Sequence, residues 1–153
     1  MTSVSNHHIY EYTPAEFDVD VTWEDVLDKV HDEYAKGTCQ IVYHLMEVPP
    51  SFVCHSNYLP GSIRKAAENV SKKVLVKELH IYISVAGGAS TFERHCDDKD
   101  VLLVGGIGKV SYWFDDDKEI VLNPGDSLFI QAGTFHRPVV HGPRATLSFT
   151  LGQ

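Results

Sequence analysis

The chain has 153 residues, a formal net charge of −8 at pH 7 and a hydrophobic fraction of 43%. This length and composition indicate one globular domain that is large enough to bury a core. No run of basic residues is longer than Lys72-Lys73, so a surface that binds nucleic acid is not expected. The apolar runs are far shorter than a bilayer is thick, and no interaction with a membrane is expected either.

The cysteines and the first residues bear on the cellular compartment. Cys39, Cys54 and Cys96 are odd in number and lack the spacing of metal-binding motifs. A disulfide framework is therefore not expected, and a reducing compartment is the default. The opening residues, MTSVSNHHIYEY, lack the charged and apolar regions of a signal peptide. Together these features predict a cytoplasmic protein.

Two helices are predicted in the first half of the chain. The first is expected over Thr22–Gly37, because Thr22 and Asp25 resemble a capping box and Gly37 stands where a C-terminal cap belongs. A second, shorter helix is predicted over Ser62–Val70. In the first helix, apolar side chains recur at helical spacing and predict one buried face, formed by Trp23, Val26, Leu27, Val30 and Tyr34.

The rest of the chain is predicted to form short strands and turns. Residues 1–20 are expected to be an arm or a first short strand with His7 and His8 on the surface, and Val53–Gly61 is expected to be irregular. Helices followed by closely spaced strands are typical of a mainly β fold, a small barrel or jelly roll with two N-terminal packing helices. The predicted strands are Cys39–Met46, Val74–Val85, Val101–Val104, Val110–Phe114, Glu119–Leu122, Leu128–Gln131, Phe135–Val140 and Arg144–Leu151, with a bend at Gly105–Gly108.

A candidate metal site lies in the segment FERHCDDKD, where one residue separates His95 from Asp97. In an extended strand the side chains at i and i+2 point to the same face, so the imidazole and the carboxylate are expected to converge. His136 lies on a later predicted strand and supplies a second imidazole. Two histidines and one carboxylate are the ligands of non-haem Fe(II) oxygenases. We therefore expect His95, Asp97 and His136 to be metal ligands and catalytic residues.

Residues 75–151 resemble the cupin superfamily in their glycine spacing. The segment GDSLFIQAGTFH, residues 125–136, matches the second cupin motif except that Gln131 replaces a proline. Gly88 leads to His95, and Gly108 closes the first motif at the expected distance. The resemblance implies the cupin jelly-roll barrel, a double-stranded β-helix.

Two departures from the ordinary cupin pattern point to one branch of the superfamily. Asp97 stands where ordinary cupins have a second histidine, and Val101 stands where they have a glutamate. The resulting three-residue site resembles that of the Fe(II)/2-oxoglutarate-dependent oxygenases, and within them the small JmjC-type and cupin-like hydroxylases. The resemblance implies Fe(II), 2-oxoglutarate as cosubstrate and dioxygen, and a dioxygenase that forms succinate while it hydroxylates a substrate C–H. It favours a protein or peptide side chain as the substrate.

Such an enzyme also needs a cation for the distal carboxylate of 2-oxoglutarate, because an unpaired buried charge is costly. Arg144 is the first candidate, since it begins the last predicted strand and an arginine pairs bidentately with a carboxylate. Ser148 is expected on the same face of that strand. JmjC-like enzymes more often use a lysine two residues beyond the closing glycine. Lys109 is one position short of that register, which turns it to the opposite face, and it remains a second candidate.

Two hydroxyl residues are further candidates for contact with the cosubstrate. Tyr82 lies on the strand before the metal segment, and Thr91 lies just before His95. Both are equally well explained as half-buried strand residues. His80 shares a face with Tyr82 and is expected in the core.

Two other functions remain open at this stage. One is a metal-dependent cupin enzyme that does not use 2-oxoglutarate, and the other is a non-catalytic cupin module that binds a ligand or partner. The chain is predicted to be a single cupin-like domain over residues 1–153, with an arm and helices in 1–73 and the barrel with its metal site in 74–153. Cupins often dimerise through an outer sheet face, which makes Leu147 and Phe149 candidates for a homodimer interface.

Overall fold

A computed structural model describes residues 9–44 and 47–152 of the chain. His7 and His8, which were expected at the surface, lie outside the described residues. Within the described part, the chain forms two helices and ten strands. All strand pairs named within the two sheets are antiparallel. The fold is mainly β, as predicted.

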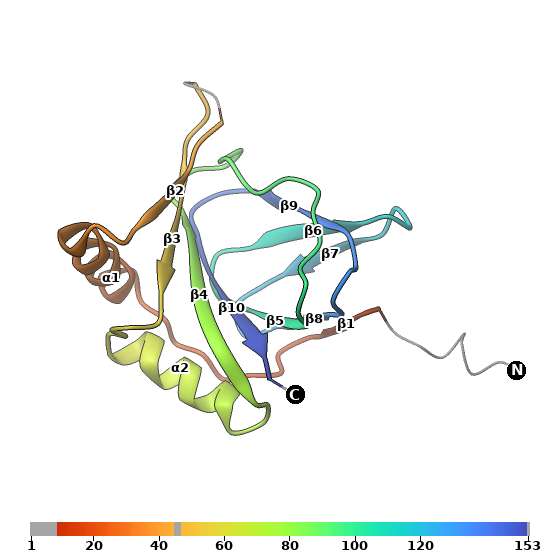
Figure 1. The fold of residues 1–153 in the computed structure, drawn as a ribbon, viewed down its shortest axis with the longest axis horizontal. Helices are drawn as coiled ribbons and strands as arrows, with labels where there is room; N and C mark the ends of the chain where they lie inside the picture. Colours follow the sequence, from red (N-terminus) through yellow and green to blue (C-terminus); the bar gives the residue numbers. More distant parts are fainter. Residues whose placement is uncertain (1–8, 45–46, 153) are drawn as a thin grey trace, which may run out of the picture.

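The strands form two sheets that face each other (Figure 1). The seven-stranded sheet has the order β1 (Tyr10–Thr13), β8 (Ser127–Ile130), β5 (Val101–Ile107), β10 (Arg144–Leu151), β4 (Val76–Ser84), β3 (Ser51–His55) and β2 (Gln40–Val42). The three-stranded sheet has the order β7 (Glu119–Leu122), β6 (Val110–Phe114) and β9 (His136–Val140). This arrangement is the double-stranded β-helix that the resemblance to cupins implied.

The large sheet separates two apolar layers. Side chains alternate between the two faces of a strand, so β10 places Leu147 and Phe149 on one face and Ser148 on the other. The inner layer lies between the two sheets and contains Val101, Leu103, Val110, Tyr112, Phe114, Leu122, Leu128 and Ile130. The outer layer joins the large sheet to the helices and includes Val26, Cys54, Ile63, Ala66, Val70, Leu79, Ile81, Ile83, Leu147 and Phe149.

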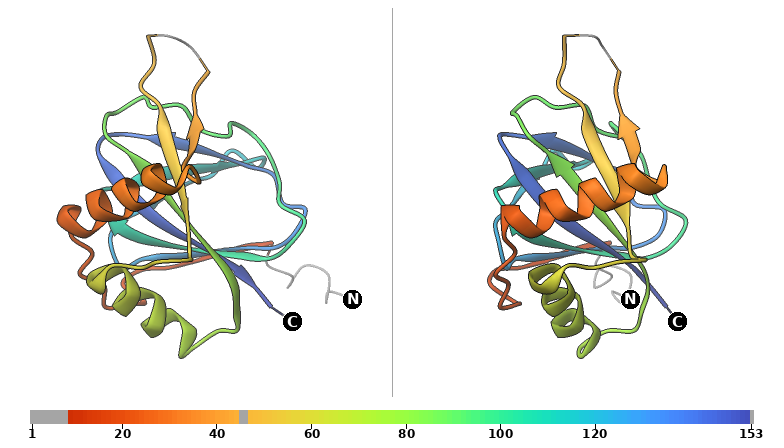
Figure 2. Two further views of the ribbon diagram at one scale, coloured as in Figure 1. Left: turned by 60° about the vertical axis from the view of Figure 1, so that its left-hand side comes forward. Right: turned by 90° about the vertical axis from the view of Figure 1, so that its left-hand side faces the viewer.

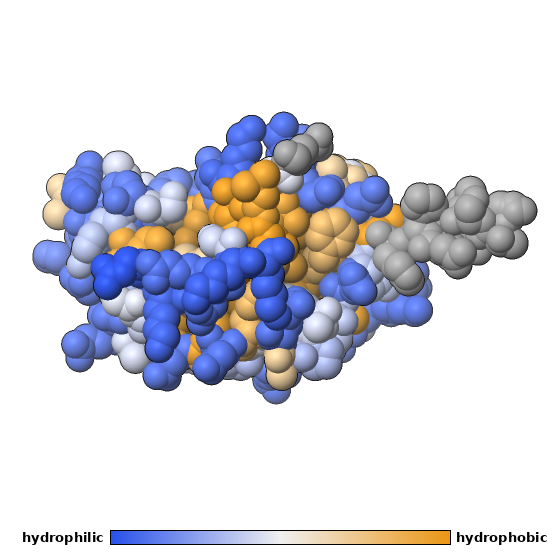
Figure 3. All heavy atoms as spheres, turned by 90° about the horizontal axis from the view of Figure 1, so that it is seen from below, coloured by the Kyte–Doolittle hydropathy of each residue, from blue (hydrophilic) through white to orange (hydrophobic). Residues whose placement is uncertain are grey.

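Both helices cover the outer face of the large sheet. Figure 2 shows α1 (Trp23–Lys36) and α2 (Gly61–Ser71) on the same side of the strands. Thr22 caps α1 by accepting a 3.2 Å hydrogen bond from the backbone N–H of Asp25, and Gly37 ends it with φ of 71°, as predicted. Seen from below, hydrophilic residues cover most of the surface, and apolar area remains visible between them (Figure 3).

The buried face of α1 differs from the predicted one. Leu27 and Tyr34 were expected in the core but are 59% and 52% exposed. Lys29 and Glu33 are fully buried instead, at 0% exposure, and their side chains form an ion pair of 3.3 Å. The helix can turn this face inward because the two opposite charges, four residues apart, satisfy each other.

The predicted homodimer interface is also wrong. Leu147 and Phe149 are both 0% exposed, because α2 packs over the outer face with Ile63, Ala66 and Val70. These two side chains stabilise the monomer and offer no surface to a second copy.

Three boundaries differ from the expected ones. Val53–Gly61 was expected to be irregular, yet Ser51–His55 forms β3 and pairs with β4. β5 continues through Gly105 to Ile107, with an irregular register opposite β10 at Gly106 and a turn at Gly108, where φ is 70°. A side chain at Gly105 would meet the backbone oxygen of Asn123 at 2.3 Å, and glycine leaves room. Since β1, β2 and β3 belong to the large sheet, residue 73 does not separate the barrel from its packing elements. Among the described helices, neither is long and apolar enough to cross a membrane.

Candidate metal centre

The backbone brings the segment that carries His95 against the start of β9. Residues 91–100 are irregular rather than a regular strand, but the His95 N–H donates to the His136 carbonyl at 2.9 Å. The reciprocal bond, from the His136 N–H to the His95 carbonyl, is 2.8 Å. Gly133, in the turn before β9, has φ of 83° and donates its N–H to the carbonyl of Asp97 at 2.9 Å. These contacts fix both histidines and the aspartate relative to one another.

The predicted ligand side chains converge. One ligand atom each from His95, Asp97 and His136 lies within 4.8 Å of the others. His136 Nε2 is 3.7 Å from an oxygen of Asp97, and the two imidazole centroids are 4.4 Å apart. The i, i+2 spacing thus gives the predicted convergence even though the segment forms only one bridge.

The two imidazoles are held by the backbone. His95 Nδ1 lies 2.8 Å from the Glu93 carbonyl, and His136 Nδ1 lies 3.0 Å from the Thr134 carbonyl. Since a carbonyl only accepts, each Nδ1 donates its hydrogen and each Nε2 keeps its lone pair. Burial lowers the pKa of His136, as does the nearby His95, against opposing effects of the Thr134 carbonyl and Asp97. The site therefore favours a neutral His136, the form that binds a metal ion.

A cavity inside the barrel opens beside these three residues. Val101, which replaces the glutamate of ordinary cupins, lies in its wall and offers no ligand atom. The cavity is lined by Val42, Ser51, Tyr82, Thr91, Phe92, His95, Asp97, Val101, Leu103, Tyr112, His136, Pro138, Arg144 and Ser148. Arg144, Tyr82, Thr91 and Ser148, all predicted to contact a cosubstrate, thus lie around the same cavity as the candidate metal ligands.

Arg144 is the buried cation of this cavity. Its side chain is 3% exposed, its Nε donates to Ser84 Oγ at 2.9 Å, and an Nη donates to Thr146 Oγ1 at 3.1 Å. Burial lowers its pKa, and the nearby Tyr112 and Tyr82 act in the opposite direction. Within residues 9–44 and 47–152, no acidic side chain forms an ion pair with Arg144. In the described part of the chain, the hydrogen bonds of its guanidinium go to hydroxyl oxygens.

Tyr82 lies near both Asp97 and Arg144 in the wall of the cavity. The Arg144 guanidinium carbon is 6.0 Å from the centroid of its ring. Burial raises the pKa of Tyr82 to about 12, and the nearby Asp97 adds to this increase. Its phenol is therefore protonated at neutral pH and available as a hydrogen-bond donor.

Thr91 and Lys109 have different surroundings from those expected of cosubstrate contacts. Thr91 Oγ1 accepts from the N–H of Glu93 at 3.2 Å and donates to the Pro138 carbonyl at 3.4 Å. These bonds hold the turn that presents His95. Lys109 is exposed in the turn between β5 and β6 and does not line the cavity, as its shifted register indicated. Of the two candidate cations for the cosubstrate carboxylate, Arg144 lines the cavity and Lys109 does not.

Two aromatic residues of the cavity were not singled out from the sequence. Phe92 lies edge-on to both Tyr82 and His95, with ring centroids 6.0 Å away in each case. Tyr112 is buried on β6. The alternation of Val110, Tyr112 and Phe114 could have placed Tyr112 inside the barrel, whereas Phe92 precedes the metal segment in an irregular stretch that carries no period.

The fold is a double-stranded β-helix with a cavity beside the three candidate metal ligands. Among solved structures, the chain matches YcfD, a ribosomal oxygenase from Escherichia coli, with a TM-score of 0.68 and 15% identity over 99% of this chain. YcfD in complex with cobalt and 2-oxoglutarate matches with a TM-score of 0.59 and 22% identity over 72% of this chain. The complex with cobalt and succinic acid gives a TM-score of 0.58 at 22% identity over 72%.

These matches define the fold. The chain corresponds to only 50% of the length of YcfD in the first alignment, and to 34% and 33% of it in the two complexes. No protein-family model matches the sequence, and no curated protein is detectably similar to it.

Proposed function

We propose that the protein is an Fe(II)- and 2-oxoglutarate-dependent oxygenase that hydroxylates a side chain of a protein or peptide. One observation carries the proposal. The cavity that contains the two histidines and the aspartate also contains a buried arginine with no acidic partner among the described residues. A buried cation without a counter-charge is costly, and an anionic ligand in the same cavity removes that cost.

The donor set fits Fe(II). His95 and His136 each present an Nε2 lone pair, and Asp97 presents a carboxylate oxygen, which is the set found in facial-triad iron sites. Bound there, the iron supplies the activation of dioxygen that a hydroxylation requires. The backbone carbonyls of Glu93 and Thr134 orient the two imidazoles, a second set of contacts on which metal affinity depends.

We place the cosubstrate between the candidate metal ligands and Arg144, which line the same cavity. We assign the distal carboxylate of 2-oxoglutarate to the guanidinium, whose planar donors suit a carboxylate. Ser84 and Thr146 already hold one side of this guanidinium, so it is ordered before the ligand arrives. Tyr82, protonated at neutral pH, and Ser148 supply hydroxyl groups along the same wall.

The comparisons support the same function. YcfD has been crystallised with cobalt and 2-oxoglutarate and with cobalt and succinic acid. It is described as a ribosomal oxygenase, which favours a protein component as the substrate of this chain as well.

The test is to add Fe(II) and 2-oxoglutarate anaerobically to the protein and to record the visible spectrum. We expect a weak charge-transfer band from the iron–ketoacid complex. Asp97→Ala should abolish it, because the carboxylate ligand is lost. The matched control Asp98→Ala, which removes an exposed neighbouring carboxylate, should retain it. If the wild-type protein binds iron but gives no band with 2-oxoglutarate, the proposal is wrong and a cupin enzyme of another type becomes the better description.

A further inference from the structure

A second group of ligand-type side chains lies on β3 and β4. His55 and His80 are directly opposite each other in the pairing of these two strands. Their ring centroids are 5.2 Å apart and the ring planes are inclined by 71°. The histidines of the candidate metal centre have a similar relation, at 4.4 Å and 59°. The geometry of the second pair thus resembles that of the two histidines in the candidate metal centre.

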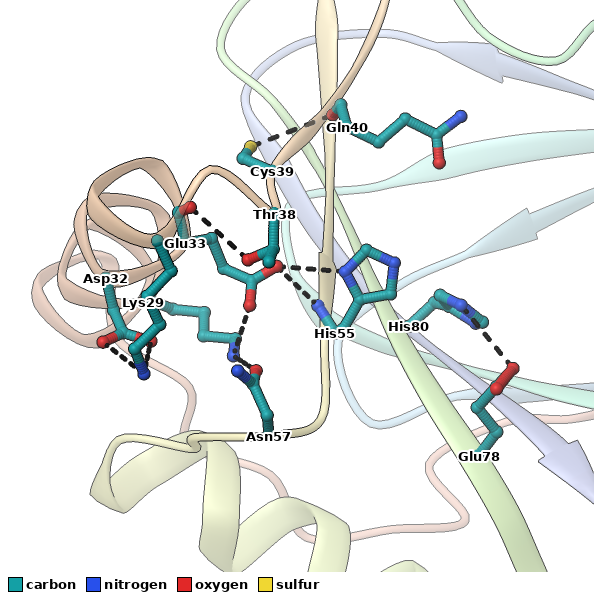
Figure 4. Close-up of polar contacts among 11 residues, drawn as sticks. Lys29, Asp32, Glu33, Thr38, Cys39, Gln40, His55, Asn57, Glu78 and His80 are labelled. Atoms are coloured by element: carbon teal, nitrogen blue, oxygen red, sulfur yellow. Dashed lines mark hydrogen bonds and ion pairs between the residues drawn. The ribbon is translucent and has the colours of Figure 1, made fainter.

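The orientation of His55 is fixed by a buried carboxylate. Glu33 Oε1 is 3.0 Å from His55 Nδ1 and also accepts the backbone N–H of His55 at 3.1 Å. Glu33 is in turn held by Lys29, whose Nζ also donates to Asn57. Figure 4 shows the imidazole of His55 between Glu33 and His80. Because Nδ1 points to the carboxylate, Nε2 lies on the side away from Glu33 and presents its lone pair there.

This pairing has a chemical precedent in metal sites. A histidine that binds a metal ion typically donates its other ring N–H to a carboxylate or a carbonyl, which fixes the tautomer and makes the imidazole more basic. Glu33 stands in that relation to His55. The carboxylate of Glu33 already has two partners, Lys29 and the backbone N–H of His55. Neither of these contacts requires the His55 imidazole to point toward Glu33.

A carboxylate completes the group. Glu78 lies two residues before His80 on β4, and its side chain therefore points to the same face of the sheet. Glu78 Oε1 is 3.6 Å from His80 Nε2. Glu78 is exposed, and both histidines are partly exposed, so an ion can reach all three.

We propose that His55, His80 and Glu78 bind a second divalent transition-metal ion of the zinc class. Two imidazoles and one carboxylate are ligands that zinc accepts, with a water molecule in the fourth position. Among the described residues, only His95, Asp97 and His136 have three ligand atoms within 4.8 Å of one another. The second site therefore closes when the ion binds, by rotation of the exposed Glu78 and the partly exposed His80 toward the fixed His55.

The proposed site shares no ligand with the first one. His80 and Glu78 line an open groove whose wall also includes Asp97 and Tyr82. Two lysines, Lys77 and Lys99, and one further acid, Asp98, line the same groove. An ion on His55 and His80 would join β3 to β4 at the edge of the groove, next to the candidate active site but independent of its function.

The test is a calorimetric titration of the metal-stripped, full-length chain with Zn²⁺. A His95→Ala/Asp97→Ala background removes two ligands of the first site and isolates the second. We expect this double variant to bind one Zn²⁺ per chain at the second site. Adding His80→Ala or Glu78→Gln to the double variant should abolish or weaken that binding. Glu33→Gln should lower the affinity by about 10- to 100-fold, since it removes the carboxylate that orients His55.

The controls separate loss of binding from loss of folding. Glu78→Gln changes an exposed side chain and leaves the buried network intact, and far-UV circular dichroism should be unchanged. His31→Ala removes an exposed histidine of α1 outside the group and should retain the Zn²⁺ affinity. The proposal is overturned if the background binds no Zn²⁺, or if its Zn²⁺ binding persists unchanged in both His80→Ala and Glu78→Gln.

Discussion

Arg144 shows how one buried charge can be both costly and useful. Taking a guanidinium out of water costs several kcal/mol, and the hydrogen bonds that Arg144 donates to Ser84 and Thr146 offset only part of that cost. The neighbouring phenols of Tyr82 and Tyr112 are neutral at pH 7, and burial raises the pKa of both further above the ordinary value of 10. The positive charge of Arg144 therefore lacks an anionic partner among the described residues, and a carboxylate of a dicarboxylate cosubstrate would supply one.

The first prediction concerns this guanidinium. Arg144→Lys keeps the charge but loses the planar fork, and we expect the affinity for 2-oxoglutarate to fall by about 10- to 100-fold, as for loss of a hydrogen bond to a charged group. Titration of the Mn(II)-loaded protein with 2-oxoglutarate measures this without turnover, and Mn(II) affinity itself should not change. Arg137→Lys, at the exposed arginine beside His136, is the matched control. Equal affinity in Arg144→Lys and wild type would exclude Arg144 as the anchor.

Individual site residues can be predicted from the sequence where they follow a regular spacing. His95, Asp97 and His136 could be predicted, because the two-residue repeat of extended chain and the glycine spacing constrain them. Lys29 and Glu33 could not, since both are ordinarily exposed residue types and their burial depends on β3 packing beneath α1. His80 was expected in the core, yet it is partly exposed and lines a groove.

Among the elements, β1 is attached to the large sheet by a carboxylate as well as by its pairing with β8. Asp126, in the turn before β8, accepts the backbone N–H of Ala15 at 2.8 Å through one oxygen. Its other oxygen accepts the Tyr12 hydroxyl at 2.8 Å and the Asn123 N–H at 2.9 Å. Burial raises the pKa of Asp126, but these hydrogen bonds outweigh burial and lower it below its ordinary value of 3.8. The ionised carboxylate thus joins the N-terminal strand to the edge of the large sheet.

The second prediction follows from that shift. Asp126→Asn should reduce the free energy of unfolding at pH 7 by about 1.5–3 kcal/mol, because an amide offers one accepting oxygen to three donors. A group whose pKa is lowered by folding stabilises the fold above its ordinary pKa and loses that effect as the pH falls through the folded value. The difference between wild type and variant should therefore be complete at neutral pH and narrow below about pH 4. Urea unfolding across this range measures it.

Asp20→Asn changes an exposed carboxylate, and its effect should stay within about 0.5 kcal/mol at every pH. If the difference in free energy of unfolding between wild type and Asp126→Asn does not decrease in acid, ionisation of Asp126 does not stabilise the attachment of β1.

Elements were predictable where local chemistry decides them. The caps of α1 and the short strands β6, β7 and β10 match expectation, since caps and turn residues are local signals. The buried face of α1 and the existence of β3 were not predictable, because each depends on a partner distant in the sequence. His55 and the residues before it form a strand because β4 offers a free edge for pairing.

On the scale of the whole molecule, the N-terminal half is part of the barrel as well as its cover. The large sheet takes three of its seven strands from residues before 73, and α1 and α2 close its outer face. The sequence predicted a jelly roll with packing helices, and that is confirmed. The interdependence of the two halves could not be predicted, because it arises from pairing of strands that are distant in sequence.

The third prediction tests this interdependence. A fragment of residues 74–153 keeps His95, Asp97, His136 and Arg144, so it would suffice for the first metal centre if the barrel were formed by this half alone. Removal of the helices exposes five buried side chains of the outer layer, Leu79, Ile81, Ile83, Leu147 and Phe149. At roughly 1.5–3 kcal/mol for each exposed side chain, the loss is about 8–15 kcal/mol, as large as the total stability of a typical domain. We expect the fragment to lack cooperative urea unfolding and near-UV circular dichroism, whereas the full-length chain in the same buffer shows both. A fragment that unfolds cooperatively and binds Zn²⁺ through His95, Asp97 and His136 would show instead that the helices only protect a barrel that folds without them.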